Sequence, residues 1–492
     1  MNILLIYPKY PETFWSFKHV LKFVHRKATF PPLGLMTVAA MLPKEWNKRL
    51  IDVNITELKD KDIKWADMVF ISAMIVQKKS AKEIISKCKE NGKRVVAGGP
   101  LFTIQYKEFQ GVDHFVLGEA EVTLPFFLKD LKNNKPKYVY TSSIRPDITK
   151  TPIPIWNLIN FKDYVTMPVQ YSRGCPFNCE FCDIIVMNGR KPRTKTPEQL
   201  VSEIQSLYEA GWKGGIFIVD DNFIGNKVNV KKMLPELIKW QKQHKYPYQI
   251  ITEASINLAD DTELMEMMSV ANFSKVFLGI ETPCVESLKE SGKTQNISRD
   301  LAQSVRIIQG YGMQVMGGFI IGFDKDTESI FETQIKFIQK IGVVQAMVGL
   351  LTAIPKTRLW HRLKAEGRII KNPSGENTQK GLNFIPKMGK EKLVSGYKKV
   401  IKTLYSPKNY YKRINTFIKN YKPTVRVKIS FSDFCAFLKS TVKIGVFSKS
   451  RILYWKLLIK TFLTKRKALP IAIELAIIGL HFEKFMQYII NL

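Results

Sequence analysis

Three cysteines gather in one short stretch of the sequence, Cys175, Cys179 and Cys182. Their spacing, Cys-x-x-x-Cys-x-x-Cys, allows three thiolates from one loop to converge on a single metal centre. The surrounding loop is rich in Gly and Pro, whereas cysteines that only fill space prefer the regular elements of a core. The pattern therefore predicts a metal or cluster site.

The ligand count narrows the type of centre. A structural zinc site takes four ligands, and His114 and His244 are both far from the cysteines in the sequence. A dithiol redox pair would use Cys179 and Cys182 and leave Cys175 unexplained. Three thiolates suit a 4Fe–4S cluster that keeps one iron open to an outside ligand, in contrast to the usual ligation by four cysteines.

At this motif the chain resembles the radical S-adenosylmethionine superfamily. The signature of that family is Cys-x-x-x-Cys-x-aromatic-Cys, and Phe181 supplies the aromatic residue. The resemblance implies that the open iron binds the amino and carboxylate groups of S-adenosylmethionine, whose reductive cleavage yields a 5′-deoxyadenosyl radical. It also implies an electron donor such as a flavodoxin or a ferredoxin.

A series of alternating strands and helices between about residues 166 and 370 must position this loop. A helix is expected from Pro197, with Thr196 as its N-cap. Six strands are too few for a closed eight-stranded barrel and match the open six-fold βα barrel of the radical family. We expect the strands at residues 169–172, 215–219, 249–254, 275–280, 314–321 and 346–352.

Functional groups of βα barrels lie at the carboxyl ends of the strands. The amine and the ribose of S-adenosylmethionine need hydrogen-bond acceptors, which carboxylates provide. For each polar residue there, the alternative is a helix cap or a loop hydrogen bond. Cys284, close to the same face, is either a substrate-facing thiol or an inert packing residue, and no catalytic side chain is assigned. The predicted S-adenosylmethionine ligands are Phe181, Asp220, Asp221, Glu253, Ser255 and Glu281.

Residues 1–130 show a second alternation of strands and helices, which predicts a doubly wound, Rossmann-like or flavodoxin-like sheet. Such sheets bind ligands at the carboxyl ends of their strands. The phrases at residues 31–35, 97–100 and 116–121 resemble the cobalamin-binding domain that precedes many radical cores. The Asp-x-His-x-x-Gly motif, which supplies the lower axial histidine in other cobalamin proteins, is missing. The predicted cobalamin ligands are Ser72, Gly98, Gly99, Pro100, Gly118 and Glu119.

A degenerate sheet that has lost its ligand and only supports the barrel is the alternative for this first domain. Residues 131–165 are polar, basic and marked by four prolines, so we expect an ordered crossover or linker. With 492 residues, the chain is long enough for two or three domains. Six cysteines in such a chain form no disulfide scaffold, which favours a reducing, cytoplasmic setting.

The chain carries a formal net charge of +33, and more than half of the excess lies after residue 380. Residues 371–492 are expected to form a mainly helical, basic extension. The phrases at residues 383–388 and 404–413 resemble an extension shared by hopanoid C-2 methylases and archaeal enzymes that remodel tetraether lipids. Basic helices with an apolar face lie in membrane interfaces, and the alternative is a solvated lid on the barrel. No apolar stretch reaches the length of a spanning helix, since the best candidate, residues 469–480, contains Glu474.

Together these features favour a cobalamin-dependent radical enzyme that methylates a hydrophobic, lipid or isoprenoid-like substrate. We expect it in the cytoplasm, peripheral on the inner face of the membrane. The alternatives are radical ring formation or carbon–carbon coupling on a lipid without methyl transfer, and modification of tRNA or another RNA. Methylthiotransferases of the RNA class need a second cysteine trio in the N-terminal domain, where Cys88 stands alone.

Overall fold

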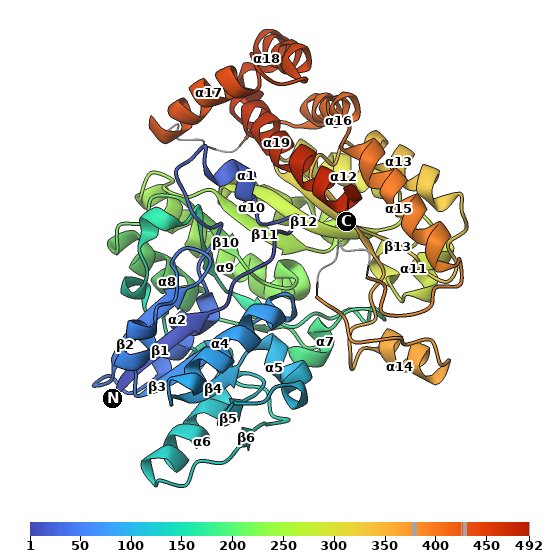
Figure 1. The fold of residues 1–492 in the computed structure, drawn as a ribbon. Coiled ribbons are helices and arrows are strands. Elements are labelled where there is room, and N and C mark those ends of the chain that lie inside the picture. The colour runs from blue at the N-terminus through green and yellow to red at the C-terminus, as the bar shows by residue number, and fades with distance from the viewer. Residues whose placement is uncertain (376–380, 425, 427–430, 492) are drawn as a thin grey trace.

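The computed structural model describes residues 1–375, 381–424, 426 and 431–491. The first part of the chain forms a six-stranded parallel sheet, drawn mainly in blue in Figure 1. Its strand order is β2-β1-β3-β4-β5-β6, so the order reverses beside β1, at the switch point of a doubly wound sheet. The strands are β1 (Asn2–Tyr7), β2 (Asn47–Asp52), β3 (Met68–Ser72), β4 (Arg94–Gly98), β5 (His114–Val116) and β6 (Val139–Tyr140).

Helices cover both faces of this sheet, which is why β1 is apolar at almost every position. Two helices pack on one face and three on the other. This arrangement confirms the predicted doubly wound fold. One face carries α2 (Leu33–Met41) and α6 (Ala120–Lys132), and the other carries α3 (Asp60–Trp65), α4 (Lys78–Glu90) and α5 (Pro100–Gln105).

The predicted connector, residues 131–165, is more than a linker. It contributes β6 to the first sheet, beyond the domain boundary expected at residue 130. Trp156 packs into the core of the second domain, and the Tyr164 hydroxyl donates a hydrogen bond of 3.1 Å to Asp52 Oδ2. The connector therefore joins the cores of both domains.

The second sheet has six parallel strands in the order β14-β13-β12-β11-β10-β7, as expected for an open βα barrel. Its strands are β7 (Thr166–Val169), β10 (Gly215–Ile218), β11 (Ile250–Ala254), β12 (Phe273–Glu281), β13 (Gln314–Ile321) and β14 (Ala346–Leu350). The helices between them are α8 (Pro197–Glu209), α9 (Lys227–Gln243), α10 (Thr262–Val270), α11 (Val285–Glu290), α12 (Leu301–Gly310) and α13 (Ile330–Ile341).

Thr196 caps α8 as predicted, because its hydroxyl accepts a hydrogen bond from Gln199 N. The first barrel strand differs from the expected range 169–172. It ends at Val169, and the chain leaves the sheet because the backbone N–H groups of Tyr171 and Ser172 bind a carboxylate instead of a neighbouring strand.

The C-terminal part of the chain is helical, as predicted. α15 and α16 pack against α13, and α19 packs against α1 (Lys18–Leu21), α16 and α18. α17 and α18 lie outermost, at the top of Figure 1. Within the described residues, we find no helix with the length and apolar character needed to cross a membrane. The helices are α14 (Arg358–Ala365), α15 (Lys390–Leu404), α16 (Pro407–Asn420), α17 (Phe431–Lys443), α18 (Arg451–Lys465) and α19 (Leu469–Asn491).

Candidate functional site

A small antiparallel ladder closes the loop that carries the three cysteines. In it, β8 (Ser172–Arg173) pairs with β9 (Arg193–Thr194), so residues 174–192 form one closed loop, here called the cluster loop. Gly174 stands at its entry with φ of 95°, and a Cβ there would lie 2.9 Å from the carbonyl oxygen of Gly189. Glycine is therefore needed to let the two ends of the loop approach each other.

Lys293 is a charged neighbour of the three thiols. Burial raises the pKa of Cys175 and of Cys182, and the positive charge of Lys293 opposes both shifts. Burial alone would lower the pKa of Lys293, but the charges of Glu281 and Cys179 raise it. Sequence reasoning missed this lysine because it follows the cluster motif by more than a hundred residues and belongs to no recognisable pattern.

Two amides point at the sulfur atoms. Asn222 Nδ2 lies 3.7 Å from Cys175 Sγ, and Gln295 Nε2 lies 3.8 Å from Cys179 Sγ. Nowhere in the described residues do three or more His, Cys, Asp or Glu side chains converge as a single metal ion requires. The assignment of a cluster therefore depends on the loop motif, on the donors around it and on the comparisons below.

Asp220 fixes the entry to the cluster loop. Its carboxylate is fully buried and accepts hydrogen bonds from Tyr171 N (2.8 Å), Ser172 N (2.8 Å) and Ser172 Oγ (2.7 Å). Burial raises the pKa of Asp220 to about 7, although these hydrogen bonds lower it again in part. This geometry favours a positioning role for Asp220 over the predicted contact with S-adenosylmethionine.

Asp221 and Ser255 also form hydrogen bonds that position groups around the cysteines. Asp221 Oδ2 accepts hydrogen bonds from Gly174 N (3.3 Å) and Asn188 Nδ2 (2.9 Å), both in the cluster loop. The backbone N–H and hydroxyl of Ser255 both lie within hydrogen-bond distance of Asn222 Oδ1. Through Asn222, the end of β11 thus holds the amide that faces Cys175.

Glu253, in contrast, is free to meet a ligand. It lies on β11 and is partly exposed, and within the described chain its carboxylate has no hydrogen-bond or ion-pair partner. Burial raises its pKa to about 8, and the charges of Asp221 and Asp220 add to the rise. A carboxyl group in this setting is suited to bind a cationic or hydroxyl-bearing ligand.

Glu281 is paired with Lys293 at the end of β12. Lys293 Nζ lies 2.7 Å from Glu281 Oε1, and it also stands 6.0 Å from the centre of the Phe181 ring. Glu281 has φ of 64°, a strained conformation that is typical of functional sites. A Cβ on Gly279 would lie 2.5 Å from Glu281 Oε1 and 2.7 Å from Lys293 Nζ, so this pair needs glycine beside it.

Two buried carbonyl oxygens near Lys293 also fit the binding of S-adenosylmethionine. Gln295 Oε1 and Asn296 Oδ1 are buried acceptors without a hydrogen-bond partner in the described part of the chain, and both residues lie within three positions of Lys293. Buried polar atoms are normally satisfied, so such atoms call for a ligand or water. The site thus combines three thiols, one ammonium group, one unpaired carboxyl group and two orphaned carbonyl oxygens.

The predicted cobalamin ligands gather at the carboxyl edge of the first sheet. Ser72 ends β3 and Gly98 ends β4, and Gly99 is the N-cap residue of α5, which begins at Pro100. Gly99 has φ of 85°, and a Cβ there would lie 2.4 Å from Ser72 Oγ. Gly118 is exposed with φ of 76° and has open space around its Cα, as close approach of a large ligand requires.

Glu119, the last of the predicted cobalamin ligands, forms ion pairs with two arginines. Its carboxylate lies 2.9 Å from Arg173 Nη1 and 2.9 Å from Arg193 Nη2, and Arg173 also binds Glu121 at 2.7 Å. Both arginines belong to the β8–β9 ladder beneath the cluster loop. Glu119 therefore ties the first domain to that loop, and a buried double ion pair leaves its oxygens little capacity for a cofactor.

The two ligand edges face each other. Met187 of the cluster loop and Ile354 after β14 pack against the core of the first domain. Lys356 donates a hydrogen bond from Nζ to Thr103 O across the same boundary. Figure 1 shows α7 (Ile184–Met187) between the two sheets.

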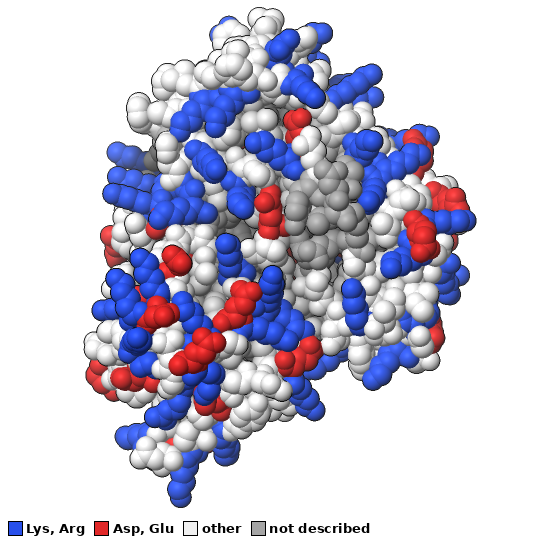
Figure 2. Space-filling model, viewed as in Figure 1, with Lys and Arg blue, Asp and Glu red and all other residues white. Residues whose placement is uncertain are grey.

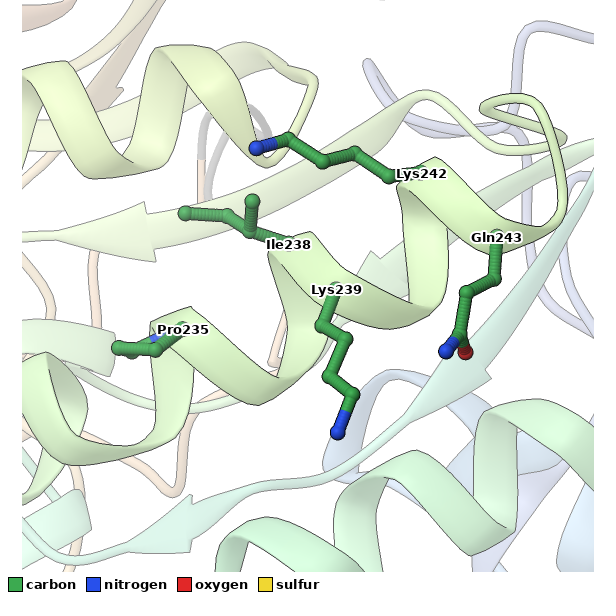
Figure 3. Close-up of a pocket in the computed structure, with 5 residues that line it drawn as sticks. All are labelled: Pro235, Ile238, Lys239, Lys242 and Gln243. Atoms are coloured by element: carbon green, nitrogen blue, oxygen red, sulfur yellow. The ribbon is translucent and has the colours of Figure 1, made fainter.

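Two other features lie outside this arrangement. Cys284 precedes α11, and its Sγ lies 3.5 Å from Glu286 Oε2. A surface hollow on α9, shown in Figure 3, is lined by residues of that helix alone and contains none of the groups described above. Its lining residues are Pro235, Ile238, Lys239, Lys242 and Gln243.

Family models match three consecutive parts of the chain. The B12 binding domain matches residues 22–128, the Radical SAM superfamily matches residues 169–338, and a domain of unknown function, DUF4070, matches residues 357–491. The model of the radical superfamily thus covers the cluster loop and the four barrel strands β10 to β13.

Two curated relatives match nearly the whole chain. The uncharacterized methyltransferase sll1242 of Synechocystis sp. is 43% identical over 462 residues, covering 92% of this chain and 86% of the relative. The hopanoid C-2 methylase of Rhodopseudomonas palustris is 34% identical over 469 residues, covering 92% of this chain and 88% of the relative.

Solved structures share the fold at low sequence identity. OxsB, a cobalamin-dependent S-adenosylmethionine radical enzyme, aligns with a TM-score of 0.62 at 15% identity, over 100% of this chain and 80% of that one. TsrM from Kitasatospora setae, a radical S-adenosylmethionine methyltransferase, aligns with a TM-score of 0.61 at 13% identity, over 98% and 99% of the two chains. With its B12-binding sheet facing a radical S-adenosylmethionine barrel, the chain belongs to the family of cobalamin-dependent radical S-adenosylmethionine methyltransferases.

Proposed function

We propose that the chain transfers a methyl group to an unactivated carbon of a hydrophobic, lipid or isoprenoid-like substrate. The observation that carries the proposal is the meeting of the two ligand edges, with the B12-binding sheet turned towards the cluster loop. When bound, the 4Fe–4S cluster and S-adenosylmethionine supply the radical that removes hydrogen, and cobalamin supplies the methyl group.

The protein's own side chains would hold these cofactors. Cys175, Cys179 and Cys182 would bind the cluster, and the Lys293 ammonium group would balance negative charge beside it. The Glu253 carboxyl group, which has no partner among the described residues, would accept a hydrogen bond from the amine or the ribose of S-adenosylmethionine.

Cobalamin would lie along the carboxyl edge of the first sheet. The left-handed backbone at Gly99 and Gly118 and the small residues at Ser72 and Gly98 would let it approach the strand ends. Pro100 follows directly as the first residue of α5. The ion pairs of Glu119 would hold this edge at a constant distance from the cluster loop.

The inner face of the barrel supports an apolar substrate. Four barrel strands have apolar side chains at positions that are only partly buried, whereas the adjacent positions in the same strands are covered by the outer helices. The partly buried residues are Phe217, Ile251, Phe277 and Met347. Trp15 lies against this lining, with Nε1 3.0 Å from Met347 Sδ and its ring 5.6 Å from that of Phe277. A polar substrate would lose its hydration here without gaining partners.

The register of the strands places this lining beside the unpaired carboxyl group. Glu253 and Phe277 are partners across β11 and β12, so their side chains lie on the same face of the sheet. The relative named hopanoid C-2 methylase supports a lipid or isoprenoid-like substrate. The proposal includes a flavodoxin or ferredoxin as electron donor and peripheral attachment to the inner face of the membrane through the basic tail.

Anaerobic purification with cobalamin present tests the cofactor set. We expect about four iron atoms per chain and corrinoid absorption bands, and a variant with all three motif cysteines changed to Ala should lose the iron and keep the corrinoid. The reduced enzyme, given methyl-deuterated S-adenosylmethionine and a lipid extract, should yield a product heavier by one deuterated methyl group. A product that only loses hydrogen would establish ring formation or coupling instead, and failure to cleave S-adenosylmethionine would refute the proposal.

A further inference from the structure

Large apolar side chains are concentrated on the outside of one segment. Of the 23 exposed large hydrophobic residues in the described chain, 11 lie between residues 431 and 463, in α17, α18 and the turn that joins them. Single exposed hydrophobic residues are ordinary, but a gathering of this size marks an interaction surface. The residues are Phe431, Phe434, Leu438, Val442, Val446, Phe447, Ile452, Trp455, Ile459, Phe462 and Leu463.

α17 is apolar on two opposite sides. Ala436, Ser440 and, one residue past the end of the helix, Ile444 are buried at a spacing of four residues and face the protein. Phe434, Leu438 and Val442 follow at the same spacing of four residues but are shifted by two, which places them about 200° away around the helix. The outward stripe is therefore separate from the packing face, and the described residues leave about half of each of its side chains exposed.

α18 repeats this arrangement. Tyr454, Leu457 and Leu458 are buried against the neighbouring helices. The outward stripe includes Ile452 and Ile459, and Trp455 of the same stripe donates from Nε1 to Gly445 O at 3.0 Å. This bond joins the outward stripe of α18 to the turn after α17, so the two helices present one surface, here called the apolar hairpin face.

Positive charge surrounds the apolar hairpin face. Residues 431–467 contain nine Lys and Arg and one acidic residue, Asp433. Figure 2 shows Lys and Arg beside the uncharged surface at the top of the molecule, over these helices. Apolar residues flanked by basic ones are typical of helices that lie in the headgroup region of anionic membranes. The exposed basic residues are Lys443, Lys449, Arg451, Lys456, Lys460, Arg466 and Lys467.

We propose that the apolar hairpin face inserts into the surface of an anionic lipid bilayer. This inference deepens the proposed function, because it places the barrel on the membrane that would contain a lipid substrate. The basic residues around the apolar hairpin face favour an anionic bilayer over a second copy of the chain, because two such strongly basic surfaces would repel each other.

Flotation of the full-length holoenzyme with vesicles tests the proposal. We expect binding to vesicles that contain phosphatidylglycerol and much weaker binding to pure phosphatidylcholine. Phe447→Asp with Leu463→Asp, at positions 79% and 73% exposed, should weaken binding at least tenfold. Ile144→Asp with Val228→Asp, at positions 72% and 64% exposed in a loop and a helix elsewhere, is the matched control and should bind like the wild type.

The charge contribution has its own test. Lys456→Gln and Lys460→Gln should each weaken binding to the anionic vesicles about fivefold. Equal flotation of the Phe447/Leu463 variant and the wild type would overturn the proposal. So would a wild-type dimer that this variant converts to monomers without any vesicle binding, because the face would then join two copies of the chain.

Cleavage of S-adenosylmethionine to 5′-deoxyadenosine separates this inference from the proposed function. The Phe447/Leu463 variant should retain cleavage, which shows that it is folded. If neither the wild type nor the variant cleaves S-adenosylmethionine but flotation follows the predicted order, the proposed function is refuted. The inference that the apolar hairpin face binds membranes is then still supported.

Discussion

Removal of the charge at Glu253 should stabilise the cofactor-free protein at alkaline pH. The carboxyl group keeps its proton up to about pH 8 in the folded chain, against an ordinary pKa of 4.5. Between these values the folded state binds more protons than the unfolded state. The free energy of unfolding therefore falls as pH rises through this window, by at most about 1.4 kcal/mol per pH unit.

The size of the effect follows from the same shift. The side chain is partly exposed, and solvent screening reduces its cost, so we expect Glu253→Gln to gain roughly 2–4 kcal/mol above pH 8 and almost nothing at pH 5. Denaturant unfolding of the anaerobic apoprotein at both pH values measures this difference. Glu266→Gln, at an exposed position of α10, is the matched control and should change stability by less than about 0.5 kcal/mol.

A gain from Glu253→Gln that is equal at pH 5 and pH 8.5 would refute the reasoning, because it would show that the carboxyl group is not held in its neutral form by the fold. If the proposal for S-adenosylmethionine is also correct, the same variant should bind that cofactor more weakly. A variant that is more stable without ligand and binds S-adenosylmethionine more weakly has lost a functional group. Substitution of a purely structural residue would instead lower the stability.

Three further predictions concern charged pairs around the cluster loop and at the end of β12. Lys293→Met should lower the reduction potential of the reconstituted cluster by on the order of tens of millivolts, measured by redox titration with EPR. Lys293→Arg retains the positive charge and should leave the potential close to that of the wild type. An unchanged potential in Lys293→Met would contradict the placement of this charge. Gly279→Ala should cost about 1–3 kcal/mol of stability by denaturant unfolding, because its Cβ displaces the Glu281–Lys293 pair, while Gly34→Ala, with open space around it, should be neutral within about 0.5 kcal/mol. Arg173→Gln should lower the free energy of unfolding by about 3 kcal/mol because it removes one ion-pair partner from Glu119 and from Glu121. Limited proteolysis should then cleave the chain between the two domains sooner. An unchanged cleavage pattern would show that these ion pairs do not hold the two domains together.

The sequence by itself determined the features that depend on neighbouring residues. The three cysteines lie within eight positions, so the prediction of a shared cluster needed no knowledge of the fold. The alternation of apolar runs and helical patterns predicted both parallel sheets, because strands covered on two faces must be apolar along their length. The cap at Thr196 and the boundaries of β13 followed from the same local rules.

Only the tertiary structure decided which predicted side chains are available to a ligand. Asp220 and Glu253 both lie near the ends of strands, yet the backbone of residues 171 and 172 binds the Asp220 carboxylate, whereas the Glu253 carboxylate has no partner among the described residues. Glu119 is neutralised by two arginines, and Lys293 enters the site from a distant loop. These outcomes depend on contacts between residues far apart in the chain, for which a single sequence carries no local signal.

The tail shows the same division. Its composition predicted basic, apolar helices, but composition does not say which side of a helix the protein covers. The fold buries α15, α16 and α19 against the barrel and leaves one apolar side of α17 and α18 uncovered. Because burial is settled by the packing of whole elements, the sequence could predict that the surface exists but could not locate it.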